Sequence, residues 1–283
     1  MRSFFYWCGR LPCHAHTGVI LVLLCWILNW GLDGLRTHLL FFPQWLGYCL
    51  FLSGWTQLRA RSSLLSRHPG AYTSLFLLSI PVWWLFEGLN QFTGNWVYLG
   101  REAFGPFTYA FFATLSFSTV IPAVFTTTEF LGTFRLPLVD KEFQGFSCSR
   151  RALWGLQLTG WLMLILMVIF PRVFFPFMWL SLFFILDSMN ALRSRSSLLL
   201  SLSKGKPKGL ILLGLGALCC GFFWEMWNIY AYPKWIYDIP YLEFWHLFEM
   251  PLAGYGGYIP FAWELYAIYH FVMPGRKILK LTS

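Results

Sequence analysis

Long apolar segments separated by short polar ones run through this chain from residue 17 to residue 271. Runs such as 18–32 and 210–224 hold no charged residue at all. A helix needs about 20 mainly apolar residues to cross a bilayer. The pattern predicts eight membrane-spanning helices, at 17–34, 38–57, 71–92, 105–131, 152–170, 174–191, 209–230 and 242–271. The expected fold class is an all-α polytopic membrane protein.

Several segments of the first half recur, in the same order, in the second half. The decamer LRARSSLLSR (58–67) is followed much later by LRSRSSLLLS (192–201). The other matched pairs are FFPQWL (41–46) with FFPFMWL (174–180), and FEGLNQFTGNWVY (86–98) with WEMWNIYAYPKWIY (224–237). The ordered matches predict two tandem four-helix membrane repeats related by an axis along the membrane normal, as in parallel-repeat transporters.

These repeats give the expected domain organisation. The first four-helix repeat covers 17–134 and the second covers 152–273. A cytoplasmic N-terminal segment (1–16), a cytoplasmic linker (135–151) and a basic cytoplasmic tail (274–283) complete the chain. The last helix of the second repeat is expected to be broken, because proline and glycine weaken a helix. The residues concerned are Pro251, Gly254, Gly256, Gly257 and Pro260.

Composition and charge exclude other classes of protein. The chain is 57% hydrophobic and only 12% charged, against about 25% charged in average soluble domains. The net charge is +9, but all except four of the 21 Lys and Arg fall on one side of the predicted topology. The exceptions are Arg36, Arg101, Arg172 and Lys234. This positive-inside bias places both termini in the cytoplasm, with a bacterial cytoplasmic membrane as the expected location, and it makes a nucleic-acid partner unnecessary.

Carboxylates inside two predicted spans are the main candidates for chemistry. Glu87 and Glu225 each precede an asparagine, Asn90 or Asn228, on the same helical face. A buried carboxylate costs free energy unless it is protonated, paired or placed in a polar site. Two interpretations stay open: the pairs clamp helices together, or they form a site. The aromatic residues that follow, Trp96-x-Tyr98 and Trp235-x-Tyr237, either belong to an interfacial belt or wall that site.

The broken helix adds a second group of polar residues. His246 and Glu249 are expected to share one helical face and to meet Glu225 and Asn228, with Glu264 further along. Such a cleft, in the outer half of the membrane, would hold catalytic Glu225, Glu249 and His246. Its substrate-binding residues would be Asn228, Trp235, Tyr237, Glu87, Asn90 and Glu264. Burial should raise the pKa values of its carboxyl groups.

The sequence gives no reason to expect a metal or a cofactor. Cys8, Cys13, His14 and His16 do not match a common zinc spacing. The chain contains no glycine-rich phosphate loop. Asp187 is expected to pair with the nearby Arg193.

An intramembrane acid, a Trp-x-aromatic and a helix bearing Pro and Glu follow one another in the second half. In this chain they are Glu225, Trp235-Ile236-Tyr237, and then FEMP (248–251) or PFAWE (260–264). This frame of about 45 residues resembles the repeated helical unit of membrane lycopene cyclases of carotenoid biosynthesis. In FEMP the Glu precedes the Pro, which reverses the family's order. The resemblance implies an isoprenoid or polyene substrate, with Glu225, Glu249 and Glu264 as possible acids.

Two classes of function follow. In the first, the protein binds or converts a long apolar isoprenoid, polyene or lipid molecule by acid–base chemistry in a dry cleft. In the second, it is a transporter or a non-catalytic membrane subunit of a larger complex, with other membrane proteins as partners. Whether the chain is an enzyme, and what it acts on, the sequence leaves undecided.

Overall fold

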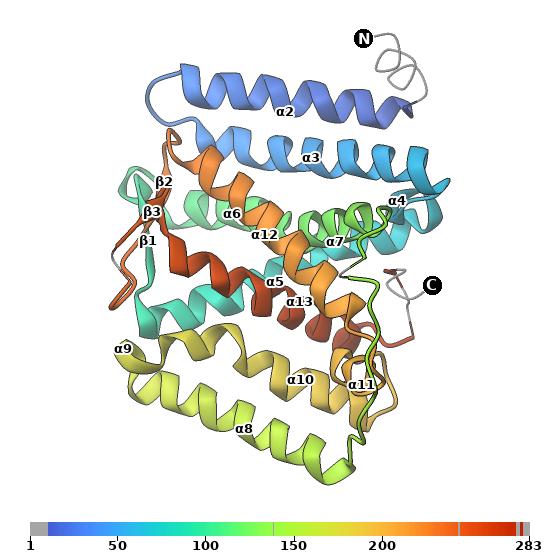
Figure 1. Cartoon of the computed structure of the whole chain (residues 1–283). Helices are drawn as coiled ribbons and strands as arrows, with labels where there is room; N and C mark the ends of the chain where they lie inside the picture. The colour runs from blue at the N-terminus through green and yellow to red at the C-terminus, as the bar shows by residue number, and fades with distance from the viewer. Residues whose placement is uncertain (1–10, 138, 243, 276–277, 280–283) are drawn as a thin grey trace. The chain divides into compact units, whose positions relative to one another are not determined.

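A computed structural model describes all residues except 1–10, 138, 243, 276–277 and 280–283 (Figure 1). The described part is mostly helical, as an all-α membrane protein requires. The long helices are α2 (Cys13–Gly31), α3 (Thr37–Ala60), α5 (Pro69–Thr93), α6 (Pro106–Phe117), α7 (Val120–Leu131), α8 (Arg150–Ile169), α10 (Ser181–Leu192), α12 (Lys208–Asn228) and α13 (Tyr258–Val272).

Short elements connect these helices. Three are α-helical: α4 (Leu64–Arg67), α9 (Pro171–Phe174) and α11 (Leu198–Ser203). Three are 3-10 helices: η1 (Arg101–Ala103), η2 (Phe175–Trp179) and η3 (Leu252–Gly257). Two small sheets pair β1 (Trp96–Leu99) with β2 (Lys234–Tyr237), and β3 (His246–Leu247) with β4 (Met250–Pro251).

Six helices in the described part are long and apolar enough to cross a membrane. They are Cys13–Gly31, Pro69–Thr93, Pro106–Leu131, Arg150–Ile169, Pro171–Leu192 and Lys208–Asn228. The expected helix at 38–57 is present as α3 but is not among these six. The expected helix at 242–271 is shorter than predicted, because α13 begins only at Tyr258. The count of eight spans therefore remains a prediction.

Two of the predicted spans are interrupted where the sequence suggested continuous helices. In the predicted span 105–131, α6 ends at Phe117 and α7 begins at Val120. Ser79 joins the two pieces: its hydroxyl donates to the Phe117 carbonyl (2.6 Å) and accepts from the Ile121 amide (3.1 Å). In the predicted span 174–191, the 3-10 helix η2 precedes α10. At the break between α6 and α7, the Ser79 hydroxyl thus satisfies backbone groups that the interrupted helix leaves unpaired.

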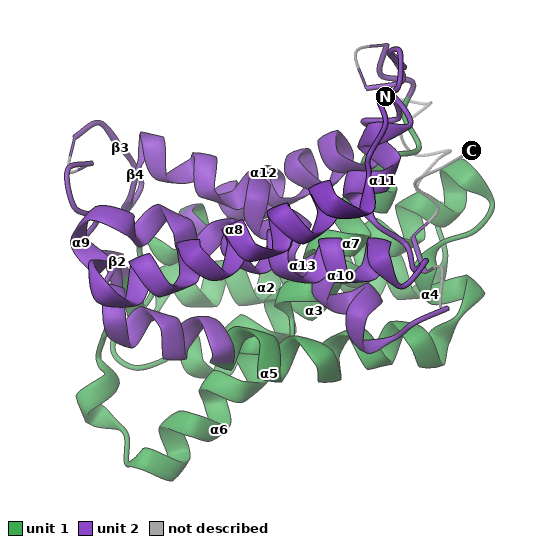
Figure 2. Cartoon of the chain, turned by 90° about the horizontal axis from the view of Figure 1, so that it is seen from below, with its two compact units in different colours: residues 1–84, 98–134, 226–235 green, residues 85–97, 135–225, 236–283 purple. Residues whose placement is uncertain are grey.

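The chain divides into two compact units, each built from three segments (Figure 2). Unit 1 comprises 1–84, 98–134 and 226–235, and unit 2 comprises 85–97, 135–225 and 236–283. Unit 1, which comes mostly from the first half of the chain, therefore includes 226–235 from the second half. Unit 2, which comes mostly from the second half, includes 85–97 from the first half. The N-terminal segment 1–16 and the tail 274–283 lie partly outside the described residues, and Cys8 lies wholly outside them.

In unit 1, α2 lies along α3 at very short range (Figure 1). Glycines permit this approach. A Cβ atom at Gly18 would lie 2.6 Å from the Gly47 carbonyl oxygen, and one at Gly47 would lie 2.8 Å from the Gly18 oxygen. Without a hydrophobic driving force in lipid, such close backbone packing is a main source of helix association.

In unit 2, α10 packs between α8 and α13. Gly160 on α8 lies against the Ser181 carbonyl and Ile185 of α10. On the other side, the Asn190 amide donates to the Ala267 carbonyl (2.9 Å). The Trp263 indole of α13 donates to the Leu210 carbonyl of α12 (2.9 Å). These contacts fix α13 against its neighbours.

The linker after α7 is held against the loop 203–208 of unit 2. The amides of Phe143 and Phe146 donate to the carbonyls of Gly205 (3.1 Å) and Ser203 (2.8 Å). The Lys208 ammonium lies 2.9 Å from the Asp140 carboxylate, and Lys206 lies 3.8 Å from Glu142. The hydrogen bond from Lys208 lowers the pKa of Asp140, which is exposed.

Candidate functional site

Glu225 is a fully buried residue of the predicted site. Another predicted site residue, Tyr237, donates a hydrogen bond to it. Glu225 lies in the last turn of α12 and is 0% exposed. The hydroxyls of Tyr237, at the end of β2, and Tyr258, at the start of α13, both donate to its Oε1 atom at 2.7 Å. Three residues of unit 2, one each from α12, β2 and α13, thus meet at one carboxylate oxygen.

A glycine makes room for the second tyrosine. The Tyr258 ring covers Gly221, one turn before Glu225 on α12, and a Cβ atom there would collide with the ring. The same ring stacks on Trp224, with centroids 5.9 Å apart. Tyr255 packs edge-on against Tyr258 and donates to the Leu247 carbonyl (3.1 Å). The position of the Tyr258 hydroxyl therefore depends on Gly221.

This geometry suits an ionised carboxylate. A buried charge is costly unless hydrogen bonds replace its hydration. Two phenol donors on one oxygen supply such bonds, and O–H to carboxylate bonds of about 2.7 Å are typical of charge-assisted pairs. The residues around Glu225 are aromatic, and Tyr237, Tyr255 and Tyr258 are only partly buried. The site therefore combines a carboxyl group that receives two phenol hydrogen bonds with ring faces that attract cations.

Asn90 and Asn228 make the same pair of contacts. The Asn90 amide donates to the Trp96 carbonyl (2.8 Å), and the Trp96 amide donates back to Asn90 Oδ1 (3.3 Å). Asn228 and Trp235 repeat both bonds, at 2.7 and 3.1 Å. Each asparagine thus fixes the chain that leaves its helix. These contacts support a structural role for both, and the substrate-binding assignment stays a prediction.

Glu87 differs from Glu225 in its partner. Its Oε1 atom accepts from the Trp96 indole at 3.0 Å, and the residue is 9% exposed. Trp96 stacks on Trp179, and Trp179 in turn stacks on Phe86. Glu87 therefore anchors an aromatic stack of unit 2, which agrees with the clamp interpretation for this glutamate.

The expected helical face carrying His246 and Glu249 does not exist, because these residues belong to a β-hairpin. His246 lies in β3 and is exposed, and Glu249 lies in the two-residue turn before β4 and is partly buried. The sequence pattern predicts the two residues three apart on a helix, but the segment 244–257 contains strands and a 3-10 helix instead. Their catalytic assignment remains a prediction without that support.

The remaining predicted residues lie at defined places in the fold. Glu264 on α13 is 0% exposed, and its Oε1 atom accepts from the Leu182 amide (3.0 Å) at the start of α10. This carboxylate satisfies one of the free amides that begin a helix. The Trp235 ring lies edge-on to Phe41, with centroids 6.1 Å apart, in unit 1.

The predicted pairing of Asp187 with Arg193 is wrong, because other groups bind this carboxylate. Its carboxylate accepts from the Ser197 hydroxyl (2.6 Å) and from the amides of Leu198 (3.0 Å) and Leu199 (2.9 Å). These amides open the short helix α11, within the second decamer. Asp187 is 0% exposed, so backbone donors rather than a cation balance it.

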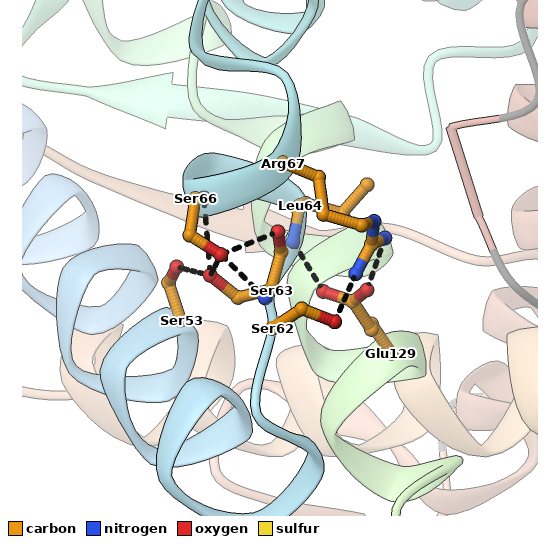
Figure 3. A network of polar contacts seen from close by, with 7 residues as sticks. All are labelled: Ser53, Ser62, Ser63, Leu64, Ser66, Arg67 and Glu129. Atoms are coloured by element: carbon orange, nitrogen blue, oxygen red, sulfur yellow. Dashed lines mark hydrogen bonds and ion pairs between the residues drawn. The ribbon is translucent and has the colours of Figure 1, made fainter.

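Sequence reasoning missed a buried ion pair in unit 1, at the first decamer (Figure 3). The Arg67 guanidinium donates to Glu129 Oε1 (2.5 Å), and the Leu64 amide donates to Glu129 Oε2 (2.7 Å). The Arg67 and Glu129 side chains are 14% and 8% exposed. Ser63 caps α4 and bonds Ser53 (2.9 Å). Two features of the sequence could have indicated this pair: a carboxylate, Glu129, within the predicted span 105–131, and the basic decamer 58–67.

Among the described residues, no group of three or more His, Cys, Asp and Glu side chains is arranged to hold a metal ion. The comparisons add no relative: no protein-family model, curated protein or solved structure matches the chain.

Proposed function

We propose that this chain is an integral membrane protein that binds a long apolar molecule of the isoprenoid, polyene or lipid class at Glu225 and converts it by acid–base chemistry. The observation that carries the proposal is the pair of tyrosine hydroxyls on Glu225 Oε1, each at 2.7 Å. A side chain within about 2.6–3.2 Å of a proton donor or acceptor is placed for proton transfer.

The chemistry follows from the surroundings of this carboxylate. Glu225, protonated when the apolar molecule binds, donates its proton to a double bond and so creates a carbocation; the carboxylate that remains, held by Tyr237 and Tyr258, then takes a proton from a carbon next to the cation, which restores a double bond and the protonated acid. The aromatic rings of Trp224, Tyr255 and Tyr258 stabilise positive charge that develops on a polyene chain. The resemblance to the helical unit of membrane lycopene cyclases supports a substrate of this class.

We also propose that the chain consists of two tandem four-helix repeats, with eight spans and both termini on the cytoplasmic side of a bacterial membrane. Local geometry supports the duplication. Asn90 and Asn228 make the same two bonds to a following tryptophan, and Ser63 and Ser197 each cap the helix of a decamer.

A matched contact of the decamer arginines supports it as well. The Arg59 guanidinium lies over the Phe134 ring (3.9 Å to the centroid) beyond the end of α7, and its counterpart Arg193 lies over the Phe271 ring (5.4 Å) near the end of α13. An arginine from each decamer therefore lies near the carboxyl end of a helix, where the helix dipole favours a cation.

The test begins with purification in mild detergent and identification of the co-purifying apolar molecules by mass spectrometry. Variants Glu225→Gln and Tyr258→Phe are compared with Glu102→Gln, whose side chain is exposed in η1. Removal of a general acid or base should lower the conversion rate by about 10²–10⁴-fold. Glu225→Gln should keep the fold, because removing a buried charge relieves a desolvation cost.

A second variant tests the geometry rather than the carboxylate. Gly221→Ala should displace the Tyr258 ring and reproduce the effect of Tyr258→Phe, whereas Gly155→Ala, with open space around its Cβ position, should not. Full ligand binding and conversion in Glu225→Gln would overturn the proposal. Substrate flux into vesicles without conversion, or purification with fixed protein partners, would favour the transporter or subunit alternative.

A further inference from the structure

Three candidate spans have one end in unit 2 at the same membrane surface. The spans Arg150–Ile169 and Pro171–Leu192 follow each other directly, so the start of the first and the end of the second lie on one side of the membrane. The span Lys208–Asn228 starts on that side as well, because only the segment 193–207 separates it from the preceding span. Arg150, the first residue of α8, therefore lies where the polar lipid headgroups begin.

The linker before α8 is held against α11 at this surface (Figure 1). The Phe146 amide donates to the carbonyl of Ser203, the last residue of α11, at 2.8 Å. Gly145 lies so close to this turn that a Cβ atom there would be 2.7 Å from the same carbonyl oxygen. Phe146 is nevertheless 56% exposed. Exposed aromatic and basic side chains together are typical of segments that lie in a membrane interface.

Basic side chains on this surface outnumber the acidic ones. The two acidic residues of the linker form ion pairs with Lys206 and Lys208, at 3.8 and 2.9 Å. Four other basic residues are exposed and form no ion pair among the described residues: Lys141, Arg150, Arg151 and Lys204. The surface therefore carries an unbalanced positive charge, which attracts anions.

An apolar face of α8 begins directly beside these arginines. Arg150, Trp154 and Leu158 are spaced four positions apart and so lie along one face of the helix. Trp154 is 52% exposed and Leu158 is 67% exposed. Trp154 lies roughly 6 Å below Arg150 along the helix axis, at the interfacial depth that tryptophan favours, and Leu158 lies deeper, among acyl chains. A single phospholipid can therefore contact the arginines with its headgroup and the helix face with its chains.

We propose that Arg150 and Arg151 bind the phosphate of an anionic phospholipid whose acyl chains lie along the Trp154–Leu158 face of α8. Guanidinium groups hold phosphate oxygens through paired hydrogen bonds, which a lysine does not reproduce. Lys141 and Lys204 add attraction to the headgroup, so the surface distinguishes an anionic lipid from a zwitterionic one. A free anion would meet the same arginines but would leave the apolar face unoccupied.

This site is separate from the one proposed for Glu225. The two sites belong to opposite ends of α12, since Glu225 is roughly 26 Å from Lys208 along the helix axis. The phospholipid at Arg150 is bound and is not converted. Loss of phospholipid binding and loss of conversion at Glu225 are therefore separate outcomes.

Lipid titration of the full chain in mild detergent, followed by native mass spectrometry, tests the proposal. Phosphatidylglycerol is compared with phosphatidylcholine that carries the same acyl chains. The double variant Arg150→Gln, Arg151→Gln is compared with Arg61→Gln, Arg172→Gln, which removes two exposed positive charges elsewhere. Circular dichroism and thermal unfolding select the variants that keep the fold, and Arg151→Gln alone replaces the double variant if that variant does not fold.

The unsubstituted chain should bind phosphatidylglycerol more tightly than phosphatidylcholine. Removal of both guanidinium groups should weaken phosphatidylglycerol binding about 30-fold, because each basic residue near a membrane surface contributes about a factor of five. The control variant should leave that affinity unchanged. Equal affinity for the two lipids, or equal effects of the two double variants, would overturn the proposal. Displacement of the lipid by inorganic phosphate at the same concentration, or tighter binding of polyglutamate, would overturn it in favour of a free anion or an acidic protein.

Discussion

Glu129 and Asp187 each receive a hydrogen bond from the first amide of a short helix, at Leu64 and Leu198. The two carboxylates are balanced differently. Among the described residues, Asp187 accepts from a hydroxyl and two amides, whereas Glu129 also pairs with the Arg67 guanidinium. At the residue scale, Glu129 therefore depends on the Arg67 cation, and Asp187 does not.

The difference predicts the effect of removing Arg67. Arg67→Met leaves the Glu129 charge without its cation, which should lower the free energy of unfolding by about 3–5 kcal/mol. In the double variant Arg67→Met, Glu129→Leu the buried charge is gone, and only the unpaired Leu64 amide remains, at about 1–3 kcal/mol. Denaturant unfolding in mild detergent measures both. If Arg67→Met costs no more than the exposed control Arg151→Met, the pair does not contribute as described.

The candidate site was only partly predictable at this scale. Glu225 and Tyr237 stand out because an acid in an apolar run, followed by Trp-x-Tyr, is unusual. Tyr258 was not named, because its contact with Glu225 requires the chain to return past Gly221, and one sequence does not show such a return. The roles of Asn90 and Asn228 were left open, and their bonds to backbone groups could not be read from residue types alone.

The docked linker is the clearest case at the scale of an element. Gly205 has a φ of 77°, which favours glycine, and a Cβ atom there would collide with the Phe143 carbonyl oxygen. The hydrogen bond from Lys208 lowers the pKa of Asp140. The ionised carboxylate therefore stabilises the folded protein at pH values above the ordinary pKa of aspartate. That contribution is lost as the pH falls and Asp140 becomes protonated.

Gly205→Ala should therefore release the linker without unfolding the helices. The expected result is faster trypsin cleavage after Lys141, which lies beside this contact, with unchanged helical circular dichroism. Gly155→Ala on α8, where a Cβ meets nothing, serves as the matched control. Equal cleavage rates in the two variants would show that the Gly205 contact does not hold the linker.

Elements were predicted well where the apolar run was long and free of breakers. The expected ranges 71–92, 152–170 and 209–230 correspond to α5, α8 and α12 within a few residues. The predicted helix 242–271 is wrong over its first part, since α13 begins only at Tyr258, although the prolines and glycines did indicate a break. Its first part is apolar and aromatic, as in a helix, and only contacts such as Phe222 with Phe248 determine that it forms a hairpin.

At the scale of the whole molecule, the number of membrane crossings depends on α3. This helix has 24 residues, or roughly 36 Å at about 1.5 Å per residue, which is long enough to span. Cysteines introduced at Asp33 and Arg61, both exposed, should react with an impermeant maleimide from opposite sides, in a background without native cysteines. Labelling from the same side would contradict a crossing by α3.

A second pair of sites serves as an internal control. Glu102 and Lys204 are separated by three candidate spans, Pro106–Leu131, Arg150–Ile169 and Pro171–Leu192. They should report opposite sides whatever α3 does. The positive-inside bias predicts that Lys204 and Arg61 face the cytoplasm. The sequence could predict this orientation but not the division into two units, since the exchange of short segments depends on tertiary contacts.

The exchanged segment 226–235 has a consequence for biosynthesis. In unit 1, the Asn29 amide donates to the Trp227 carbonyl, and the Arg36 guanidinium donates to the Tyr230 carbonyl. The ribosome must add roughly 100 residues after Phe134 before these partners exist, which takes about 5–20 s at ordinary translation rates. During that interval Asn29 and Arg36 lack these acceptors. Unit 1 can therefore reach its final hydrogen bonding only after the segment 226–235 has been synthesised.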